Sequence, residues 1–200
     1  MLKWVTVVLT DVIMTFSTDG DVSVLSVSDE PHVICAVVNS YKLNEYSLDG
    51  RLIREIRLPL KEEFNCPSPL QAIKLTSGHF VVSSYSYFRN RGLLRVCILD
   101  EYGKQLKSFD GKPGGSSFVT PYCPYHLSVD GNGFVLVVDL FSNRVLLLDS
   151  NLTFKREILS EEKHGLRHPS KIFLDESSSR IFVADGECDS GGRISIFQFG

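Results

Sequence analysis

The sequence predicts an all-β fold built from repeated units of four short antiparallel strands. Two segments, 124–139 and 169–185, share a proline, an apolar run, an aspartate, a turn and a second apolar run that ends in aspartate. Their prolines are 45 residues apart, and short runs rich in Val, Ile, Leu, Phe and Tyr, bounded by turn residues, fill each unit. No segment has clear helical periodicity. A unit of four strands and about 45 residues has the size of one propeller blade.

The units follow one another along a single domain that spans 1–200. We expect blades at 20–58, 69–110, 124–159 and 169–199, and an extra strand within 1–16. The blade at 124–159 should hold strands at 126–129, 134–138, 144–148 and 154–159. Segments such as 130–133, which reads Asp-Gly-Asn-Gly, reverse the chain cheaply through positive φ. The last blade should stop after its third strand.

Aspartate and arginine recur at fixed places in the two clearest units. One aspartate follows the first apolar run, a second ends the next run, and an arginine opens the third. Because a residue repeated in every blade usually caps a turn or orients nearby backbone, we expect structural roles, with the arginines pairing with backbone or carboxylates. These residues are Asp130, Asp139, Arg144, Asp175, Asp185 and Arg193.

The pattern formed by these residues resembles the NHL repeat, most clearly at 124–149 and 169–197. The whole chain resembles the C-terminal propeller of tripartite-motif NHL proteins. That resemblance implies a six-bladed ring, which at about 45 residues per blade needs about 270 residues. We therefore expect about four blades of a ring that is truncated at its N-terminal side, with run 4–9 as an outer strand of an earlier blade or as a closing strand. An open ring would expose sheet faces and favour self-association.

Composition and motifs give little support for catalysis, metal binding or broad phosphate binding by this chain. The net charge is -3, which argues against broad phosphate binding, and the five cysteines form no C-x-x-C pair. Catalytic residues, metal ligands and cofactors are not expected, because no known catalytic motif is present. His164 and His168 stand four apart, but their basic neighbours discourage a cation. No apolar run is long enough to span a membrane, so we expect a cytoplasmic protein without a membrane partner.

Recognition through loops on one face is the function that the sequence favours. The loop 84–92 interleaves tyrosine and phenylalanine with arginine, residue types that dominate protein hot spots and also stack on bases. The predicted loops together carry no net positive charge, which favours a protein partner over RNA. The candidate partner-binding residues are Tyr85, Tyr87, Phe88, Arg89, Arg91, Tyr122, Tyr125, Phe141, Asn143, Lys163, Arg167 and His168.

The family resemblance implies a more specific role. It points to a non-catalytic module that recognises the ubiquitination substrate of a ligase, whose RING this sequence does not contain. The alternative is a post-transcriptional regulator that binds single-stranded RNA. A lyase or lactonase activity, which some related propellers have, is less expected because a convergent set of metal ligands cannot be assembled from this sequence.

Overall fold

The chain folds almost entirely into antiparallel β-strands, which confirms the all-β expectation. The computed structural model describes residues 2–9, 12–19, 22–27, 32–37, 42–47, 49–58, 68–88, 91–109, 124–186 and 191–199. Within these ranges no helix is long and apolar enough to cross a membrane. The elements are β1 (Leu2–Leu9), β2 (Val12–Asp19), β3 (Val22–Val27), β4 (His32–Val37), β5 (Lys42–Ser47), β6 (Leu52–Arg57), β7 (Ser68–Lys74), β8 (Phe80–Phe88), β9 (Arg91–Leu99), β10 (Gln105–Phe109), β11 (Pro124–Val129), β12 (Val135–Asp139), β13 (Arg144–Leu148), β14 (Phe154–Ser160), α1 (Glu161–His164), β15 (Lys171–Asp175), β16 (Arg180–Asp185) and β17 (Arg193–Gln198).

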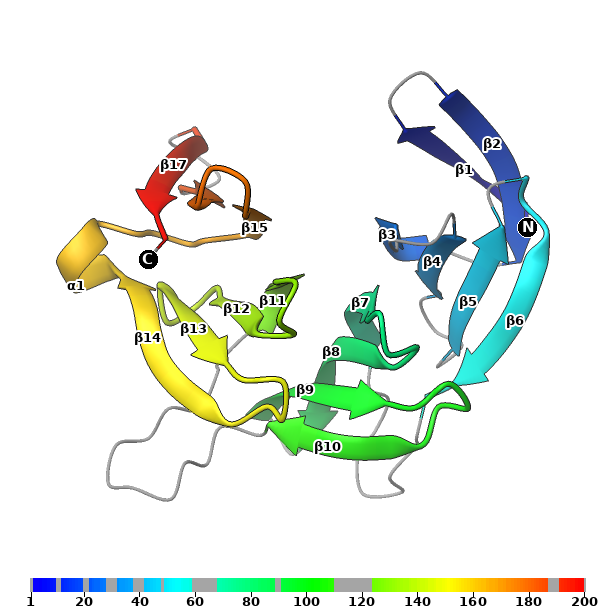
Figure 1. Cartoon of the computed structure of the whole chain (residues 1–200), viewed down its shortest axis with the longest axis horizontal. Helices are drawn as coiled ribbons and strands as arrows, with labels where there is room; N and C mark the ends of the chain where they lie inside the picture. The colour runs from blue at the N-terminus through cyan, green and yellow to red at the C-terminus, as the bar shows by residue number, and fades with distance from the viewer. Residues whose placement is uncertain are drawn as a thin grey trace.

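Four of the described sheets are propeller blades arranged around an arc (Figure 1). Blade 1 is β3–β4–β5–β6, blade 2 is β7–β8–β9–β10, blade 3 is β11–β12–β13–β14, and blade 4 is the three-stranded sheet β15–β16–β17. The first strand of each blade lies toward the centre of the arc, and β6, β10 and β14 lie on its outside. The fold is therefore a set of radially arranged antiparallel blades, as the repeat period predicts.

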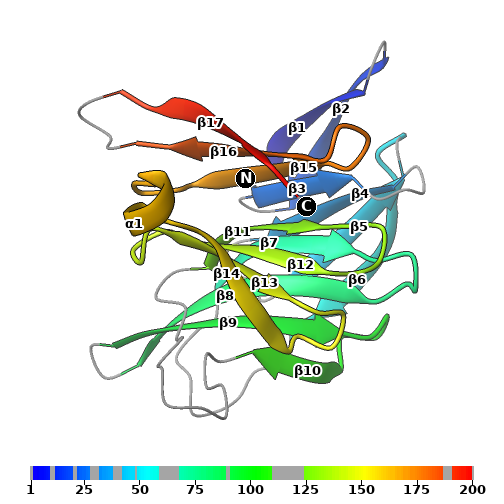
Figure 2. The same ribbon diagram turned by 60° about the vertical axis from the view of Figure 1, so that its left-hand side comes forward.

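The N-terminal segment forms a hairpin rather than one extra strand. β1 and β2 pair along their whole length, from Leu2 with Asp19 to Leu9 with Val12. The second strand is consistent with the composition of 12–19, which is rich in β-branched and aromatic side chains. β1 and β2 form a two-stranded sheet of their own and pair with no other described strand, so among the described residues the run 4–9, expected as an outer or a closing strand, does not pair with the last blade. Both views place the hairpin beside blade 1 (Figures 1 and 2).

The segment 84–94 is an extended hairpin rather than the expected long loop. β8 and β9 stay paired from Phe80 with Leu99 to Phe88 with Arg91. Alternating serines and aromatic residues favour strand, and the ladder satisfies backbone groups that a loop would leave to water. A long two-stranded arm therefore replaces the loop between the second and third strands of blade 2.

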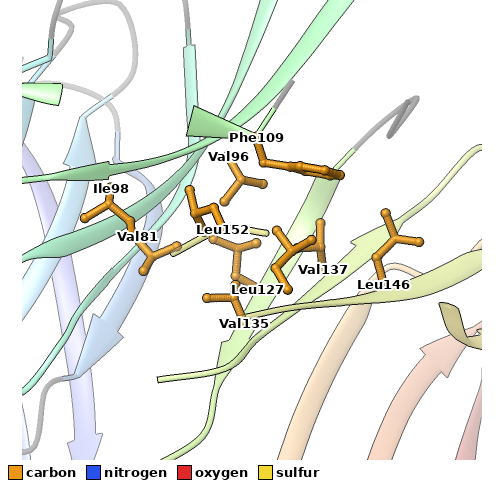
Figure 3. Packing of buried hydrophobic residues seen from close by; sticks show 10 residues of the cluster. Val81, Val96, Ile98, Phe109, Leu127, Val135, Val137, Leu146 and Leu152 are labelled. Atoms are coloured by element: carbon orange, nitrogen blue, oxygen red, sulfur yellow. The ribbon is translucent and has the colours of Figure 1, made fainter. Parts of the chain in front are cut away.

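Each central blade buries one face against the blade before it and the other against the blade after it. We call these its leading face and its trailing face. Figure 3 shows the junction between the trailing face of blade 2 and the leading face of blade 3. Fully burying one such aliphatic side chain is worth about 1.5–3 kcal/mol, so these junctions hold the arc together. The buried side chains of this cluster, all at most 6% exposed, are Val81, Val96, Ile98 and Phe109 of blade 2 and Leu127, Val135, Val137, Leu146, Leu148 and Leu152 of blade 3.

An aspartate closes the same turn in several blades. The Asp130 carboxylate accepts hydrogen bonds from the backbone N–H groups of Asn132 (3.0 Å) and Phe134 (2.7 Å). Gly133, with φ 80°, donates its N–H to the Asp130 carbonyl at 2.9 Å, and its positive φ favours glycine. Asp175 accepts in a related way from the backbone N–H of Ser177 at 3.0 Å. Both repeat aspartates are thus turn residues.

Equivalent polar side chains on neighbouring inner strands tie successive blades together. The Gln71 amide donates to the Leu127 carbonyl at 3.2 Å and accepts from the Leu127 N–H. One blade further on, His126 Nδ1 accepts from the Ile172 N–H at 3.4 Å. Gln71 and His126 each directly follow a register shift in β7 and β11. The same position of the repeat therefore makes the same inter-blade link with two different side chains.

Candidate recognition surface

The turns between second and third strands and the connection from blade 3 to blade 4 lie at one end of the blades. Figure 2 shows the connected ends of β8 and β9 and of β16 and β17, together with α1, on its left-hand side. The short turn between β12 and β13 lies at the same end because every second strand runs in the same sense. We call this end the recognition face.

Asn143 fastens two parts of the recognition face to each other. It has a φ of 52°, in the left-handed region that asparagine tolerates in turns. Its Nδ2 donates to the Glu161 carboxylate at 2.8 Å, and its Oδ1 accepts from the His168 N–H at 2.7 Å. The β12–β13 turn is thereby held against both ends of the connection 161–168. Asn143, which the sequence predicts to be a partner-binding residue, therefore also shapes the surface through these two hydrogen bonds.

Asp185 anchors the other side of the same connection. Its carboxylate accepts from the Arg193 guanidinium at 2.9 Å, the Ser195 hydroxyl at 2.8 Å and the Arg167 N–H at 3.3 Å. Arg193 also donates to the Gly165 carbonyl at 2.6 Å. Burial raises the pKa of Asp185, but the hydrogen bonds from Arg193 and Ser195 outweigh it and hold this pKa below its ordinary value. The buried carboxylate is therefore ionised and fixes the backbone on which Arg167 stands.

A second buried pair lies beneath the β12–β13 turn. Asp139 is fully buried and accepts from the Arg144 guanidinium at 3.0 Å through both Nε and a terminal nitrogen. Two atoms of one planar group thus bind one carboxylate, a geometry that fixes direction as well as distance. This pair joins the strands on either side of the turn that carries Phe141.

Four of the sequence-predicted residues stand on this fixed backbone and face solvent. Phe141 is 59% exposed in the β12–β13 turn, and the Arg167 side chain is 65% exposed. Lys163 on α1 and His168, whose φ is 43°, are exposed as well. The structure therefore brings Phe141, Lys163, Arg167 and His168 together around Asn143.

Charge on this surface is mixed. Glu161 and Glu162 occupy the first turn of α1, and Lys163 follows them. Arg167 Nε lies 3.9 Å from the Glu161 carboxylate. At this separation and exposure the ion pair contributes little to stability. The Arg167 guanidinium therefore remains able to contact a partner.

For the other predicted residues the structure describes the backbone only, or their positions lie outside the described part of the chain. Residues 85, 87, 88 and 91 are strand residues of the β8–β9 arm, and residue 125 lies in β11. The structure describes only their backbone. Two further predicted residues, Arg89 and Tyr122, lie outside the described residues. The arm nevertheless ends on the recognition face, as Figure 2 shows.

The described residues contain no group of three or more His, Cys, Asp and Glu side chains that could hold a metal ion. Burial raises the pKa of the Cys97 thiol to about 12, which removes the thiolate that a nucleophile needs. His164 Nδ1 accepts from the Ser160 N–H at 3.1 Å, and its ring packs edge-on against Phe197. His164 is thus a structural residue of the blade 3 to blade 4 connection.

A groove of about 730 Å³ runs along the inner strands toward the opposite end of the blades. Gln71, His126 and the turn residues Asp130 and Glu176 are among its lining residues. The sequence did not single out this groove, although Gln71 and His126 are 55 residues apart, the same offset as Pro69 and Pro124. This shared offset indicates that Gln71 and His126 occupy the same position of the repeat, and it is the sequence feature from which the groove could have been predicted.

Acid should weaken the junction between blades 3 and 4 through His126. Burial, and then the charge of Lys171, lower the pKa of His126 from 6.5 to about 4. Between these two pH values the unfolded chain takes up a proton that the folded chain refuses, so stability is complete above pH 6.5 and falls as the pH drops toward 4. Allowing for partial exposure, we expect a loss on the order of 2 kcal/mol at pH 4.5.

The variant His126→Gln tests this expectation, because Gln71 makes the equivalent link one blade earlier. Urea unfolding followed by circular dichroism should give His126→Gln close to native stability at pH 7 and a smaller loss between pH 7 and 4.5. Carboxylates with lowered pKa values, such as Asp185, lose their contribution only at lower pH, and they do so in both proteins. Identical pH dependence in the two proteins would contradict the role of His126.

Solved structures with similar folds are propeller-like. A luciferin-regenerating enzyme matches with a TM-score of 0.63 at 14% identity, covering 93% of this chain and 61% of that one. Virginiamycin B lyase from Staphylococcus aureus matches with a TM-score of 0.52 at 16% identity, covering 100% and 60%. A protein of unknown function from Bacteroides caccae matches at 0.56 and 13%, covering 93% and 65%. The chain is thus a β-propeller, and it spans about three fifths of the length of these structures.

These similarities show the fold and nothing finer. No family model matches the sequence, and no curated protein matches it. Two of these three proteins are named as enzymes, but sequence identities this low carry no activity or site over to this chain.

Proposed function

We propose that this chain is a non-catalytic recognition module that binds a protein partner through the recognition face. The observation that carries the proposal is an exposed aromatic and an exposed arginine on backbone fixed by buried contacts. Phe141 stands above the Asp139–Arg144 pair, and Arg167 stands on the connection that Asp185 holds. Aromatic residues and arginine are enriched at the centres of protein interfaces, and preorganised backbone lowers the entropy lost on binding.

The mixed charge of the recognition face supports a protein partner over single-stranded RNA. Glu161 and Glu162 lie next to Lys163 and Arg167, so a phosphate backbone would meet negative as well as positive groups. The net charge of -3 adds no general attraction for a polyanion. A protein surface with both signs of charge and an apolar pocket for Phe141 fits this arrangement better.

The NHL-like repeat residues support a more specific version of this proposal. In a tripartite-motif protein of that kind, such a propeller would select the substrate of a ubiquitin ligase. The turn aspartates and the Asp139–Arg144 and Asp185–Arg193 pairs recur in successive blades as the repeat requires. Ligase chemistry itself would reside in other parts of such a protein.

Quantitative affinity capture with two variants tests the proposal. The amount of partner protein crosslinked to the chain should be at least about tenfold lower for the double variant Phe141→Ala/Arg167→Ala than for the native chain. Each of the two side chains is a candidate hot spot. Tyr102→Ala is the matched control, since Tyr102 is 81% exposed in the β9–β10 turn at the opposite end of the blades. Equal capture by all three proteins would contradict the proposal.

RNA binding is checked on the same proteins. The test is fluorescence anisotropy with a mixed-sequence single-stranded RNA at low salt. The native chain and the double variant should give the same signal, because the recognition face is not expected to bind RNA. Tight, salt-dependent binding that is lost with Phe141→Ala/Arg167→Ala would replace the protein partner by RNA.

A further inference from the structure

The turn that joins β11 to β12 contains the one Asn-Gly pair of the sequence, Asn132–Gly133. Asparagine is a chemically labile residue, because the next backbone nitrogen can attack its side-chain amide. The other asparagines all precede a residue with a side chain, namely serine, glutamate, cysteine, leucine or arginine. Such a side chain shields the backbone nitrogen, whereas glycine leaves it open. Asn132 therefore has the least hindered nucleophile beside it.

Asn132 also differs from the other described asparagines in its surroundings. Asn143 hydrogen-bonds through both ends of its amide, Asn151 through its Oδ1 and Asn44 through its Nδ2. The Asn132 side chain is exposed, and no described residue hydrogen-bonds to its amide. It also lines the groove, so water reaches it. Its side chain is therefore open both to water and to rotation.

The closed turn protects this pair from reaction. The Gly133 N–H donates to the Asp130 carbonyl at 2.9 Å. The Asp130 carboxylate accepts from the backbone N–H groups of Asn132 at 3.0 Å and of Phe134 at 2.7 Å. While these bonds are made, the Gly133 N–H is engaged by the Asp130 carbonyl and does not give up its proton to solvent. The nitrogen reacts only when the turn opens locally, so the frequency of opening sets the rate.

We propose that Asn132 is the site at which this chain deamidates, and that Asp130 limits the rate by keeping the turn closed. In the open turn the Gly133 nitrogen loses its proton to a base in the solvent and attacks Asn132 Cγ. A new N–C bond closes a succinimide ring, the Cγ–Nδ2 bond breaks, and the NH₂ group takes up a proton and leaves as ammonia. Water then opens the ring at either carbonyl, which gives aspartate or isoaspartate.

The product alters a contact between blades 3 and 4. In the native chain the Glu176 carboxylate, from the β15–β16 turn, accepts from the Gly131 N–H at 2.9 Å. Deamidation adds a carboxylate to the turn that already holds Asp130 and Glu176, and like charges repel. Isoaspartate also lengthens the backbone by a methylene group, so the N–H groups that follow no longer fit the Asp130 carboxylate. Conversion of Asn132 therefore weakens the link between Gly131 and Glu176.

Peptide mass spectrometry of the whole chain, held at mildly alkaline pH, tests the site. Asn132 should convert before every other asparagine, and isoaspartate should be among its products. Asp130→Ala removes two of the bonds that close the turn and should speed the conversion at least about tenfold. Asp100→Ala is the matched control, because Asp100 holds the β9–β10 turn through the N–H groups of Tyr102 and Lys104, at 2.9 and 2.8 Å. It should leave the rate at Asn132 unchanged.

Three results would overturn the proposal. They are earlier conversion at another asparagine, an equal rate at Asn132 in the native chain and Asp130→Ala, and a product that contains aspartate without isoaspartate, which the succinimide route excludes. Circular dichroism checks that Asp130→Ala is folded. If it is not, a synthetic peptide of residues 128–137 replaces it, and this peptide should convert at least about tenfold faster than the native chain. Equal rates would show that the turn gives no protection.

Hydrogen exchange tests the effect on the neighbouring blade. Ion-exchange chromatography separates the deamidated chain by its additional negative charge. The Gly131 N–H should exchange at least about tenfold faster in this product than in the native chain, because its bond to Glu176 is weakened. The Tyr102 N–H, which Asp100 holds in blade 2, should exchange at the same rate in both. Unchanged exchange at Gly131 would overturn the proposed loss of the link.

Discussion

Replacing Glu45 by glutamine is expected to destabilise the chain by about 3 kcal/mol. The Glu45 side chain is 1% exposed in β5, and its carboxylate accepts from Lys74 Nζ at 2.8 Å and from the Arg54 guanidinium. Burial raises the pKa of Glu45, but the hydrogen bonds from Lys74 and Arg54 outweigh it, so this pKa lies below 4.5. Glu45→Gln removes the negative charge that the Lys74 ammonium, which is 11% exposed, contacts at 2.8 Å.

The large effect follows from where these charges lie. Glu45 belongs to blade 1 and Lys74 to blade 2, so their contact crosses a blade junction. Arg54 of blade 1 also stacks over the Phe80 ring of blade 2, with 5.3 Å from guanidinium carbon to ring centroid. Breaking a buried pair from one side leaves a charge that the protein interior solvates poorly, which costs more than the pair itself contributed.

Urea unfolding at pH 7 measures this prediction, and the chain supplies a matched control. Lys42 Nζ and the Glu55 carboxylate are 2.6 Å apart on β5 and β6, with exposures of 33% and 35%. Glu55→Gln should cost less than about 1 kcal/mol, because water solvates the lysine that remains. The double variant Glu45→Gln/Lys74→Met should recover part of the loss. Equal losses for Glu45→Gln and Glu55→Gln would show that burial does not control the effect.

Much of the fold was predictable because the repeat carries local information. The turn at 130–133 needs an aspartate to accept backbone N–H groups and a glycine at positive φ, and both are visible in the sequence. Strands of alternating or continuous apolar residues between such turns leave few alternatives to antiparallel pairing. The blade at 124–159 accordingly has four strands within two residues of their expected bounds.

The errors have a common physical origin in tertiary context. Aromatic and serine residues at 84–88 are compatible with a binding loop, and only the pairing of β8 with β9 shows that they extend a ladder. The N-terminal run by itself predicts one strand, because its partner, β2, lies in the next segment and not in another blade. Short strands cannot be assigned to partners from their own residues.

The recognition face was only partly predictable. Sequence position placed Phe141, Asn143, Arg167 and His168 in loops that the propeller gathers at one end. The division of roles among them depends on contacts between blades 3 and 4, such as Asn143 Oδ1 accepting from the His168 N–H. The links made by Gln71 and His126 were missed for the same reason, because they join strands that meet only after the blades have packed.

The second large effect is expected at Leu147, whose replacement by alanine should cost about 3 kcal/mol. Leu147 is 7% exposed on the trailing face of blade 3 and packs in the cluster that joins this blade to blade 4. Deleting its side chain removes buried apolar contacts and leaves a cavity between two rigid sheets that relax little.

Ile196→Ala is the repeat-equivalent control, because Ile196 occupies the same place in blade 4 and is 57% exposed. Urea unfolding of both variants at about 1 µM should give a loss of less than about 0.5 kcal/mol for Ile196→Ala. Because the two positions share strand, register and face, the difference isolates the presence of a packed neighbouring blade. A cost at Ile196 equal to that at Leu147 would mean that the trailing face of blade 4 is already covered within a single chain.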